Sequence, residues 1–440
     1  MTDGRVSAMA AGLVGSEILK IAGDIRAMVA QGETICNLTV GDFSPAEFRI
    51  PGYLEREIVQ ALSAGETNYP PSDGVMPLRK AVADFFERWL GLEYGVDSVL
   101  ITGGSRPGIF SVYSTLVDPG DVVVYPVPSW NNNHYVHISG ARGLPVTCRA
   151  EDAFLPTRAL LEEAVRGARL LALNSPLNPC GTAFTPEALG EICDMVLEEN
   201  ARRGPDERPL YVMYDQVYWM LTFGDTMHVN PVTLRPAMAA YTVFVDGISK
   251  SFAATGVRVG WTVAPVDVTQ RMASVLAHVG AWAPRAEQLA TARMIGATDE
   301  IVAYHREMKQ GVEARLDALY AGIEGLRAAG FPVRAITPMG AIYLSAQFAL
   351  HGWQTPEGEV LATNEQIRQY LLAAAGLAVV PFQAFGMKED TGWMRLSVGA
   401  TNLAEIEVMF GRLGTALKAL SAPTGVRRME GGPTAAASLP

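Results

Sequence analysis

Short apolar segments alternate with longer amphipathic segments through the middle of the chain. The apolar segments predict strands at residues 98–102, 121–125, 145–149, 170–174, 210–215 and 242–247. Between them, apolar residues at helical spacing predict helices that include residues 107–116, 157–166 and 185–200. Several of the strands are apolar nearly throughout, as expected where helices cover both faces of a sheet. This pattern predicts an α/β fold with a parallel sheet.

The two ends of the chain have a different pattern. Residues 16–31 carry apolar side chains at helical spacing, and a long helical pattern begins near residue 300. Further strands are expected near residues 332–336, 341–346 and 393–398, with more helix up to about residue 420. A smaller α+β domain is therefore expected after the α/β domain.

The chain has 440 residues, which is too many for one compact core. We expect residues 1–50 to form an N-terminal segment that packs with the small domain, and residues 51–300 to form the large domain that binds the ligand. Residues 301–420 are expected to form the small domain. The tail, residues 421–440, is rich in Pro, Gly and small residues, so we expect it to be disordered.

Composition excludes several classes of function. The net charge of −11 argues against a general nucleic-acid binder, because phosphate binding needs clustered Lys and Arg. The four cysteines are scattered, which argues against a disulfide scaffold or a zinc site. No apolar run approaches the roughly 18 residues of a membrane span, and no signal peptide is evident. We expect a soluble, cytoplasmic protein without a metal centre.

A lysine follows the last strand of this series. Lys250 stands in the run Asp246-Gly-Ile-Ser-Lys-Ser251, among small and hydroxyl side chains. Burial at a strand end disfavours the ammonium form, which lowers the pKa and makes the amine a nucleophile for a Schiff base. A surface lysine after a strand is the simpler interpretation, and the residues at the other strand ends argue against it.

Polar residues follow three other predicted strands. Asn178 lies in the segment 174–182, and Asp215 and Tyr218 come at the end of the next strand. An earlier strand is followed by residues 103–106, Gly-Gly-Ser-Arg, where small residues and a helix N-terminus suit a phosphate. Ligands bind beyond the carboxyl ends of the strands in an open parallel sheet. These segments are therefore expected to converge on one pocket.

The order of these segments resembles that of the class I/II aminotransferases, fold-type I enzymes of the aspartate aminotransferase type that depend on pyridoxal 5′-phosphate (PLP). The resemblance extends from about Ser16 to Leu420. It is most specific in the SK-x(7)-R-x-G run at residues 249–260 and in the Asn-Pro segment at residues 174–182. It implies a large domain with a mainly parallel seven-stranded sheet between helices, and a smaller α+β domain built from both chain ends.

The resemblance also implies the residues that hold the cofactor. By this resemblance, Lys250 forms the aldimine with PLP and moves the substrate proton, while Asp215 pairs with the pyridinium nitrogen. Asn178 and Tyr218 hydrogen-bond the oxygen of the ring, and Trp130 stacks on its face. The residues implied for the phosphate are Gly104, Ser105, Arg106, Ser249 and Arg258.

Contacts with the substrate and with a second subunit are implied in the same way. Arg395 binds the substrate α-carboxylate, with Asn178 and the Gly41 backbone beside it. Tyr69 reaches the phosphate of the neighbouring subunit, so we expect a homodimer. The departures from the common pattern are Gly247 in place of a serine, Cys180 in place of a threonine and Gln216 in place of a glutamate.

Together these parts imply transfer of an α-amino group from an amino acid to a 2-oxo acid. Arg106 suggests an acidic donor, aspartate or glutamate. The resemblance implies this because the aspartate and prephenate branch of the family has a lysine at the matching position, and that lysine helps bind the distal carboxylate of the substrate. Ser16 also matches that branch, whereas Ile18 stands where a threonine is expected. The alternative for Arg106 is support of the phosphate or a surface ion pair. A β-eliminating lyase or a synthase would keep the same lysine, aspartate and arginine, and is the alternative reaction.

Overall fold

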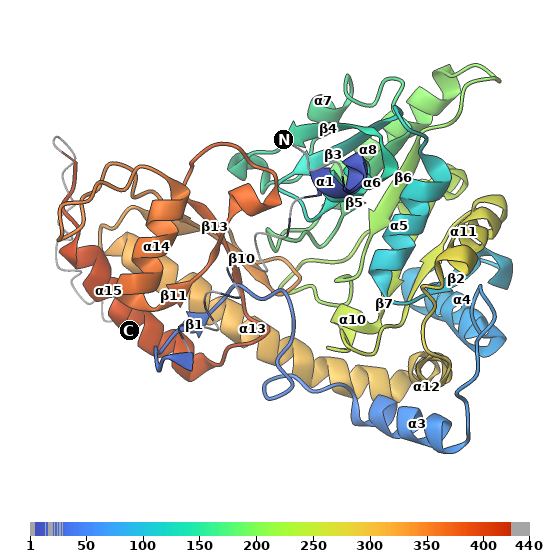
Figure 1. Cartoon of the computed structure of the whole chain (residues 1–440), viewed down its shortest axis with the longest axis horizontal. Helices are drawn as coiled ribbons and strands as arrows, with labels where there is room; N and C mark the ends of the chain where they lie inside the picture. The colour runs from blue at the N-terminus through green and yellow to red at the C-terminus, as the bar shows by residue number, and fades with distance from the viewer. Residues whose placement is uncertain are drawn as a thin grey trace, which may run out of the picture.

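Seven strands form the large sheet, in the spatial order β2-β8-β7-β6-β5-β3-β4 (Figure 1). The computed structural model of the chain describes residues 5–13, 15, 21, 23, 25, 28 and 30–423. The strands of this sheet are β2 (Val99–Thr102), β3 (Val122–Val127), β4 (Arg142–Thr147), β5 (Leu170–Asn174), β6 (Tyr211–Asp215), β7 (Thr242–Gly247) and β8 (Gly260–Val263). Only β8 runs antiparallel to its neighbours β2 and β7. The predicted mainly parallel, seven-stranded sheet is confirmed.

Sequence and structure differ most at two strands of this sheet. β4 begins at Arg142 instead of residue 145. β8 has no counterpart among the strands expected from the sequence, because its four residues, Gly-Trp-Thr-Val, are too few to establish a period. The other five strands overlap the expected segments closely, since each is a largely apolar run.

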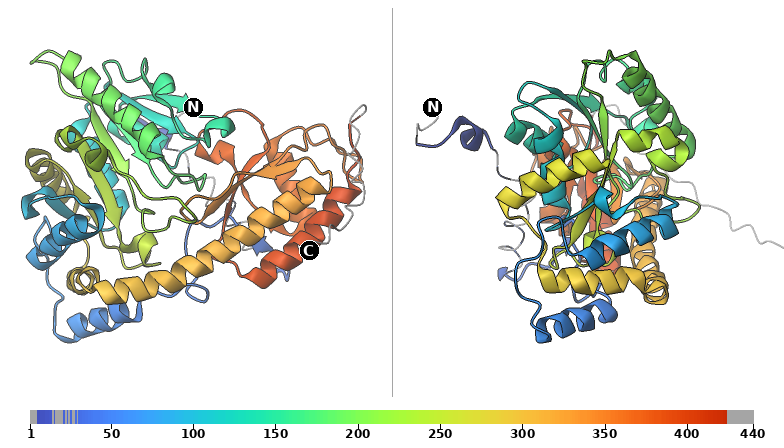
Figure 2. Two further views of the ribbon diagram at one scale, coloured as in Figure 1. Left: turned by 180° about the vertical axis from the view of Figure 1, so that it is seen from behind. Right: turned by 90° about the vertical axis from the view of Figure 1, so that its right-hand side faces the viewer.

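Helices cover both faces of the large sheet (Figure 2). One hydrophobic cluster joins the sheet to α5 (Ser105–Leu116), α6 (Asn132–Ser139) and α11 (Val266–Val279), and another joins it to α4 (Met76–Leu90), α8 (Pro186–Arg202) and α12 (Arg285–Gly296). Successive residues of β5 alternate between the two, with Leu170 and Ala172 in the first cluster and Leu171 and Leu173 in the second. Burial on both faces explains why the strands are apolar throughout.

The predicted helices form, with changed ends. α5 begins at Ser105, before the expected start, and α8 begins after Thr185, whose Oγ1 accepts a hydrogen bond from the Ala188 N–H at 3.2 Å. The helix expected at residues 157–166 is shorter than predicted, because α7 (Arg158–Leu161) ends after four residues and turns follow it.

A four-stranded sheet, in the order β12-β13-β10-β9, forms the smaller part of the molecule. Its strands are β9 (Val333–Ala335), β10 (Tyr343–Phe348), β12 (Val380–Pro381) and β13 (Trp393–Ser397), and it packs with α14 (Asn364–Ala375) and α15 (Leu403–Ala419). β1 (Cys36–Asn37) pairs in parallel with β11 (Leu377–Ala378), so an early segment of the chain joins this part. The 31-residue helix α13 (Thr298–Ala328) runs from the large part to the small one (Figures 1 and 2).

Short elements complete the described chain. The remaining helices are α1 (Ala8–Gly12), α3 (Gly52–Ser63), α9 (Pro231–Leu234) and α10 (Ile248–Ser251), with 3-10 turns at Val96–Ser98, Ala150–Asp152, Pro236–Ala240 and Phe382–Phe385. Most of the helix expected at residues 16–31, Ser16 and Ile18 among them, and most of the expected tail, residues 424–440, lie outside the described residues. The domain boundaries stay predictions. Within the described residues, no helix is long and apolar enough to cross a membrane, and no group of His, Cys, Asp and Glu could hold a metal ion.

Candidate active site

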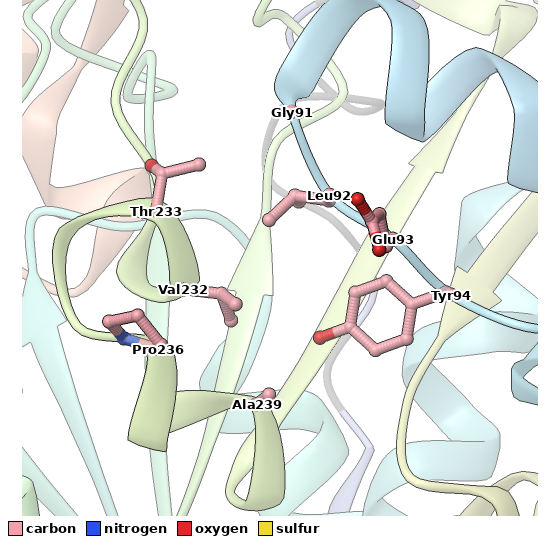
Figure 3. A pocket seen from close by; sticks show the side chains of 8 residues that line it. All are labelled: Gly91, Leu92, Glu93, Tyr94, Val232, Thr233, Pro236 and Ala239. Atoms are coloured by element: carbon pink, nitrogen blue, oxygen red, sulfur yellow. The ribbon is translucent and has the colours of Figure 1, made fainter.

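A cavity of about 650 Å³ lies at the carboxyl ends of β5, β6 and β7 and faces β10 and β13. The strand ends supply Asn174 and Asp215, α10 supplies Lys250, and the small sheet supplies Tyr343 and Arg395. A second cavity, of about 340 Å³, lies between residues 91–94, which follow α4, and residues 232–239 (Figure 3). Except for Gly104 and Tyr69, the residues predicted for the site line the first cavity, and none of them lines the second.

Lys250 lies in this cavity because α10 begins directly after β7. Its Nζ donates a hydrogen bond to the Gly41 carbonyl oxygen at 2.6 Å. Burial, together with the charges of the arginines at positions 395, 106 and 258, lowers the pKa of Lys250 from 10.5 to about 8, against the opposing charge of Asp42. A substantial fraction of the amine is therefore neutral near pH 8, which fits the predicted nucleophile.

Asp215 is the last residue of β6, and it lines the same cavity. Its Oδ1 accepts a hydrogen bond from the Val217 N–H at 3.2 Å. Burial raises the pKa of Asp215 to about 7, although this hydrogen bond and the charge of Lys250 lower it. Among the described residues, no side-chain cation lies within ion-pair distance of this carboxylate. A carboxylate in this position is stabilised by a cationic group on a ligand.

The turn before α5 forms a cradle for an anion. Gly104, with φ of 90°, precedes Ser105, the first residue of the helix. Arg258 closes the cradle by donating hydrogen bonds to the carbonyl oxygens of Gly103 at 2.9 Å and Thr255 at 2.8 Å. A Cβ on Gly104 would lie 2.3 Å from Arg258 Nη2, so the close approach requires glycine. Free N–H groups at a helix N-terminus beside a guanidinium favour a phosphate.

Arg106 and Trp130 lie on the adjoining wall of the cavity. The Arg106 guanidinium lies 4.6 Å from the centre of the Trp130 ring. No hydrogen bond joins the Arg106 side chain to another described residue. Its charge is therefore available to an anion that enters the cavity.

Ser249 also lines the cavity, whereas Gly247 meets the backbone of β8. A Cβ on Gly247 would lie 2.8 Å from the Cα of Gly260. The contact between these two glycines leaves no room for the serine side chain that the resemblance to the family implied at this position.

Arg395 is held in β13 by the loops opposite it, and only 1% of its surface is exposed. Nη2 donates to the Thr39 carbonyl oxygen at 2.5 Å, and Nη1 donates to Asn178 Oδ1 at 3.1 Å. Asn178 is fixed in turn, because its backbone N–H donates to Asn174 Oδ1 at 2.8 Å. The Nε of Arg395 is buried and has no hydrogen-bond partner within the described chain. A planar guanidinium held in this way suits a carboxylate.

Two residues that the sequence did not indicate as site residues line the cavity. Tyr343, in β10, hydrogen-bonds Tyr218 through the two hydroxyl oxygens at 2.6 Å. Its sequence context is that of an ordinary buried strand, so no local signal identifies it. Asp42 accepts a hydrogen bond from the Thr255 hydroxyl at 2.6 Å. The signal that could have indicated Asp42 is its charge, because it directly follows an apolar segment that ends at Gly41.

The remaining predicted positions lie outside this cavity. Tyr69 is 83% exposed and packs edge-on against Trp282, with ring centroids 5.6 Å apart. Gln216 is buried and contacts His228 Nε2 at 3.4 Å, away from the cavity. Cys180 is also buried and does not line the cavity.

Known proteins with similar sequences and folds are aminotransferases. The family model for aminotransferase class I and II matches residues 33–413. An aspartate aminotransferase of Rhizobium meliloti (strain 1021) is 29% identical over 409 residues, which cover 92% of this chain and 94% of that protein. A probable aspartate/prephenate aminotransferase of Thermus aquaticus is 29% identical over 361 residues, or 81% of this chain and 86% of that protein.

Solved structures agree with the sequence comparisons. The crystal structure of the aspartate aminotransferase from Rhizobium meliloti superimposes with a TM-score of 0.86 at 28% identity, and the match covers 95% of this chain and 100% of that one. The aspartate aminotransferase from Thermus thermophilus, solved with maleate, gives a TM-score of 0.82 at 25% identity over 94% and 99% of the two chains. The protein therefore belongs to the aminotransferase class I and II family, and it is an aminotransferase.

Proposed function

We propose that the chain binds PLP in this cavity with Lys250 as its covalent anchor, and that it transfers the α-amino group of aspartate or glutamate to a 2-oxo acid. The observation that carries the proposal is the pair formed by Lys250 and Asp215. An amine of lowered pKa and a carboxylate without a cationic partner among the described residues line the same cavity. The family and the names of the relatives support the same reaction.

The chemistry of the cavity fits this cofactor. A ring nitrogen that carries a proton would supply the cation that Asp215 lacks. The α5 N-terminus and Arg258 offer N–H donors to a phosphate. Trp130 supplies an aromatic face at the wall between them. The phosphate, the protonated ring nitrogen and the aromatic ring of PLP would thus each meet a complementary group of the protein.

Each residue of the chain then has a definite task. The bound cofactor supplies an electron sink for the α-carbon of the substrate. Lys250 Nζ can accept and return the α-proton, because its pKa of about 8 lies near the working pH. Arg395 binds and orients the α-carboxylate. The Tyr218 hydroxyl and the Asn178 amide are the hydrogen-bond donors for the oxygen of the ring.

A dicarboxylic donor is supported by a second guanidinium in the cavity. Arg395 serves one carboxylate, and Arg106, without a hydrogen bond to the described residues, is free to serve the other. Two relatives of similar length are named for aspartate or for aspartate and prephenate, which supports the same choice.

The donor is tested by spectroscopy and by an Arg106→Ala variant. L-aspartate or L-glutamate should remove the long-wavelength absorbance of the lysine-bound cofactor, and a 2-oxo acid should restore it. Arg106→Ala should lower kcat/KM for aspartate by about 10- to 100-fold and leave that for alanine nearly unchanged, because only aspartate has a second carboxylate.

Two outcomes of this experiment would contradict the proposal. Equal losses of kcat/KM for both donors would assign Arg106 to the phosphate and remove the argument for an acidic donor. Pyruvate released from a β-substituted amino acid, with no 2-oxo acid present and with the absorbance retained, would identify a β-eliminating lyase.

The capture of PLP by the apoprotein should depend on the protonation of Lys250. Only the neutral amine reacts, so the rate should rise with pH and level off above about 8, where Lys250 has lost its proton. Stopped-flow absorbance across the pH range measures this rate. A rate that keeps rising towards 10.5, the ordinary lysine pKa, would contradict the lowered pKa of Lys250.

We further propose a homodimer in which Tyr69 reaches the cavity of the neighbouring subunit. The 83% exposure of this large aromatic side chain, outside the cavity of its own chain, supports the arrangement. Tyr69→Ala and Lys250→Ala variants should each be nearly inactive alone. When they are refolded together in equal amounts, half of the dimers are hybrids, and each hybrid has one intact site of its two. The mixture should therefore regain about a quarter of the wild-type activity. Size-exclusion chromatography checks that dimers form. No recovery in such dimers would assign Tyr69 to its own subunit.

A further inference from the structure

Tyr343 connects two groups that the proposed function uses. It lies at the start of β10, where it pairs with Ser397 of β13, and it is fully buried. Its hydroxyl oxygen lies 2.6 Å from that of Tyr218. The Arg395 guanidinium lies 4.8 Å from the centre of its ring. Tyr343 therefore contacts both the residue implied for the cofactor oxygen and the residue implied for the substrate carboxylate.

The backbone holds Tyr343 closely in this position. A Cβ on Gly41 would lie 2.7 Å from the Tyr343 hydroxyl oxygen, and a Cβ on Gly181 would lie 2.0 Å from its carbonyl oxygen. Phe385 packs on the same guanidinium of Arg395 at 4.9 Å. Gly181 thus packs against the Tyr343 backbone and Gly41 against its hydroxyl, the Arg395 guanidinium lies over its ring, and its hydroxyl contacts that of Tyr218.

The relative acidity of the two hydroxyls gives the direction of the hydrogen bond. Each hydroxyl has one proton to donate and can accept as well. Among the described residues, Tyr218 and Tyr343 are each other's only hydroxyl partner, and both line the cavity, so the hydroxyl that does not donate within the pair keeps its proton for a ligand. Burial raises the pKa of both hydroxyls, and it holds that of Tyr218 well above its ordinary value, although the charge of Arg395 opposes the rise in both. The Arg395 guanidinium lies 4.8 Å from the centre of the Tyr343 ring, and Tyr343 is the better donor of the two. With Tyr343 as the donor, the Tyr218 proton is free for the cavity.

We propose that Tyr343 is a positioning residue that donates its hydroxyl proton to Tyr218 and thereby directs the Tyr218 proton towards an acceptor in the cavity. This inference rests on the proposed function, in which that acceptor is the ring oxygen of PLP. A hydrogen bond to that oxygen favours its deprotonated form, so the bond lowers the pH at which the absorbance of the bound cofactor titrates. Through Tyr218, Tyr343 strengthens this effect.

The test is a pH titration of cofactor absorbance in four holoenzymes: wild type, Tyr343→Phe, Tyr218→Phe and the double variant. Tyr218→Phe should raise the midpoint because the donor to the ring oxygen is lost. Tyr343→Phe should raise it in the same direction by about 0.5 to 1 pH unit. The double variant should titrate like Tyr218→Phe, because Tyr343 acts only through Tyr218.

Tyr304→Phe is the matched control. This tyrosine, in α13, also donates its hydroxyl proton, to the Arg49 carbonyl oxygen at 2.8 Å, but it does not line the cavity. The control should lower the melting temperature much as Tyr343→Phe does, without moving the titration. A purely structural role for Tyr343 would give the same result in both variants.

The outcomes separate this inference from the proposed function. An unchanged midpoint in Tyr343→Phe, or an equal extra shift when it is added to Tyr218→Phe, would overturn the role of Tyr343 and leave the proposed function standing. A wild-type protein that shows no absorbance from lysine-bound cofactor would overturn both. A shift in Tyr343→Phe that disappears in the double variant supports the inference.

Discussion

Replacing Lys250 with alanine should lower the turnover number for aspartate and a 2-oxo acid by about 10⁴-fold or more, the largest effect of any single substitution in this chain. In the proposed function the amine is both the covalent anchor and the group that moves the α-proton, and no other lysine of the described chain lines the cavity. Steady-state assays of the purified variant measure the loss.

The control for this variant is Lys80→Ala. Lys80 lies on the exposed side of α4, where its Nζ pairs with Asp84 at 2.8 Å, and its removal should leave turnover unchanged. Borohydride reduction of the wild-type holoenzyme, followed by peptide mass spectrometry, should find the cofactor on the peptide that contains Lys250. A label on a different lysine would overturn the assignment.

Replacing Asp215 with asparagine should lower kcat by about 10²- to 10³-fold, with little change in the fold. The amide fills the same space at the end of β6 but carries no charge to balance a protonated ring nitrogen. The electron sink therefore weakens, and cofactor affinity falls with it. Turnover assays together with an equilibrium titration of the apoprotein with PLP measure both effects.

Asp246→Asn provides the comparison for Asp215. Asp246 lies near the end of the neighbouring strand β7, is fully buried and accepts hydrogen bonds from the Trp219 Nε1 at 2.9 Å and the Gly247 N–H at 2.7 Å. Burial raises the pKa of Asp246 to about 8, so it carries less charge at pH 7 than an ordinary aspartate, and the amide removes one hydrogen-bond acceptor and little charge. We expect less than about a 10-fold loss of kcat. Equal losses in the two variants would mean that the Asp215 charge has no special role.

The local pattern of the sequence accounts for the large sheet and for one wall of the cavity. β5, β6 and β7 are apolar runs buried on both faces, and each ends in a polar or small residue. Because parallel strands place their carboxyl ends at one edge, the sequence alone predicts that the segment 174–182, Asp215 and Lys250 meet there. The long helix α13 and the α+β character of the last third follow from periodicity in the same way.

The opposite wall of the cavity depends on contacts between distant parts of the chain. Lys250 Nζ bonds a carbonyl 209 residues away, and Arg395 bonds one 356 residues away. Hydrophobic periodicity describes only which face of an element is buried, not which element covers it. Gly41 and Arg395 were therefore expected only from the resemblance to a family, and Asp42 and Tyr343 were not expected at all.

The sequence by itself thus determined the layers of the fold, the order of the strand ends and the place of Lys250 at one of them, because burial and strand polarity are local properties. Only the tertiary structure decided which groups face one another across the cavity. The hydrogen bond between Tyr218 and Tyr343 joins residues 125 positions apart, and it exists because the small sheet packs β10 against the loop that follows β6. That packing depends on the hydrophobic cores of the large and the small sheet together, and no single segment of the sequence encodes it.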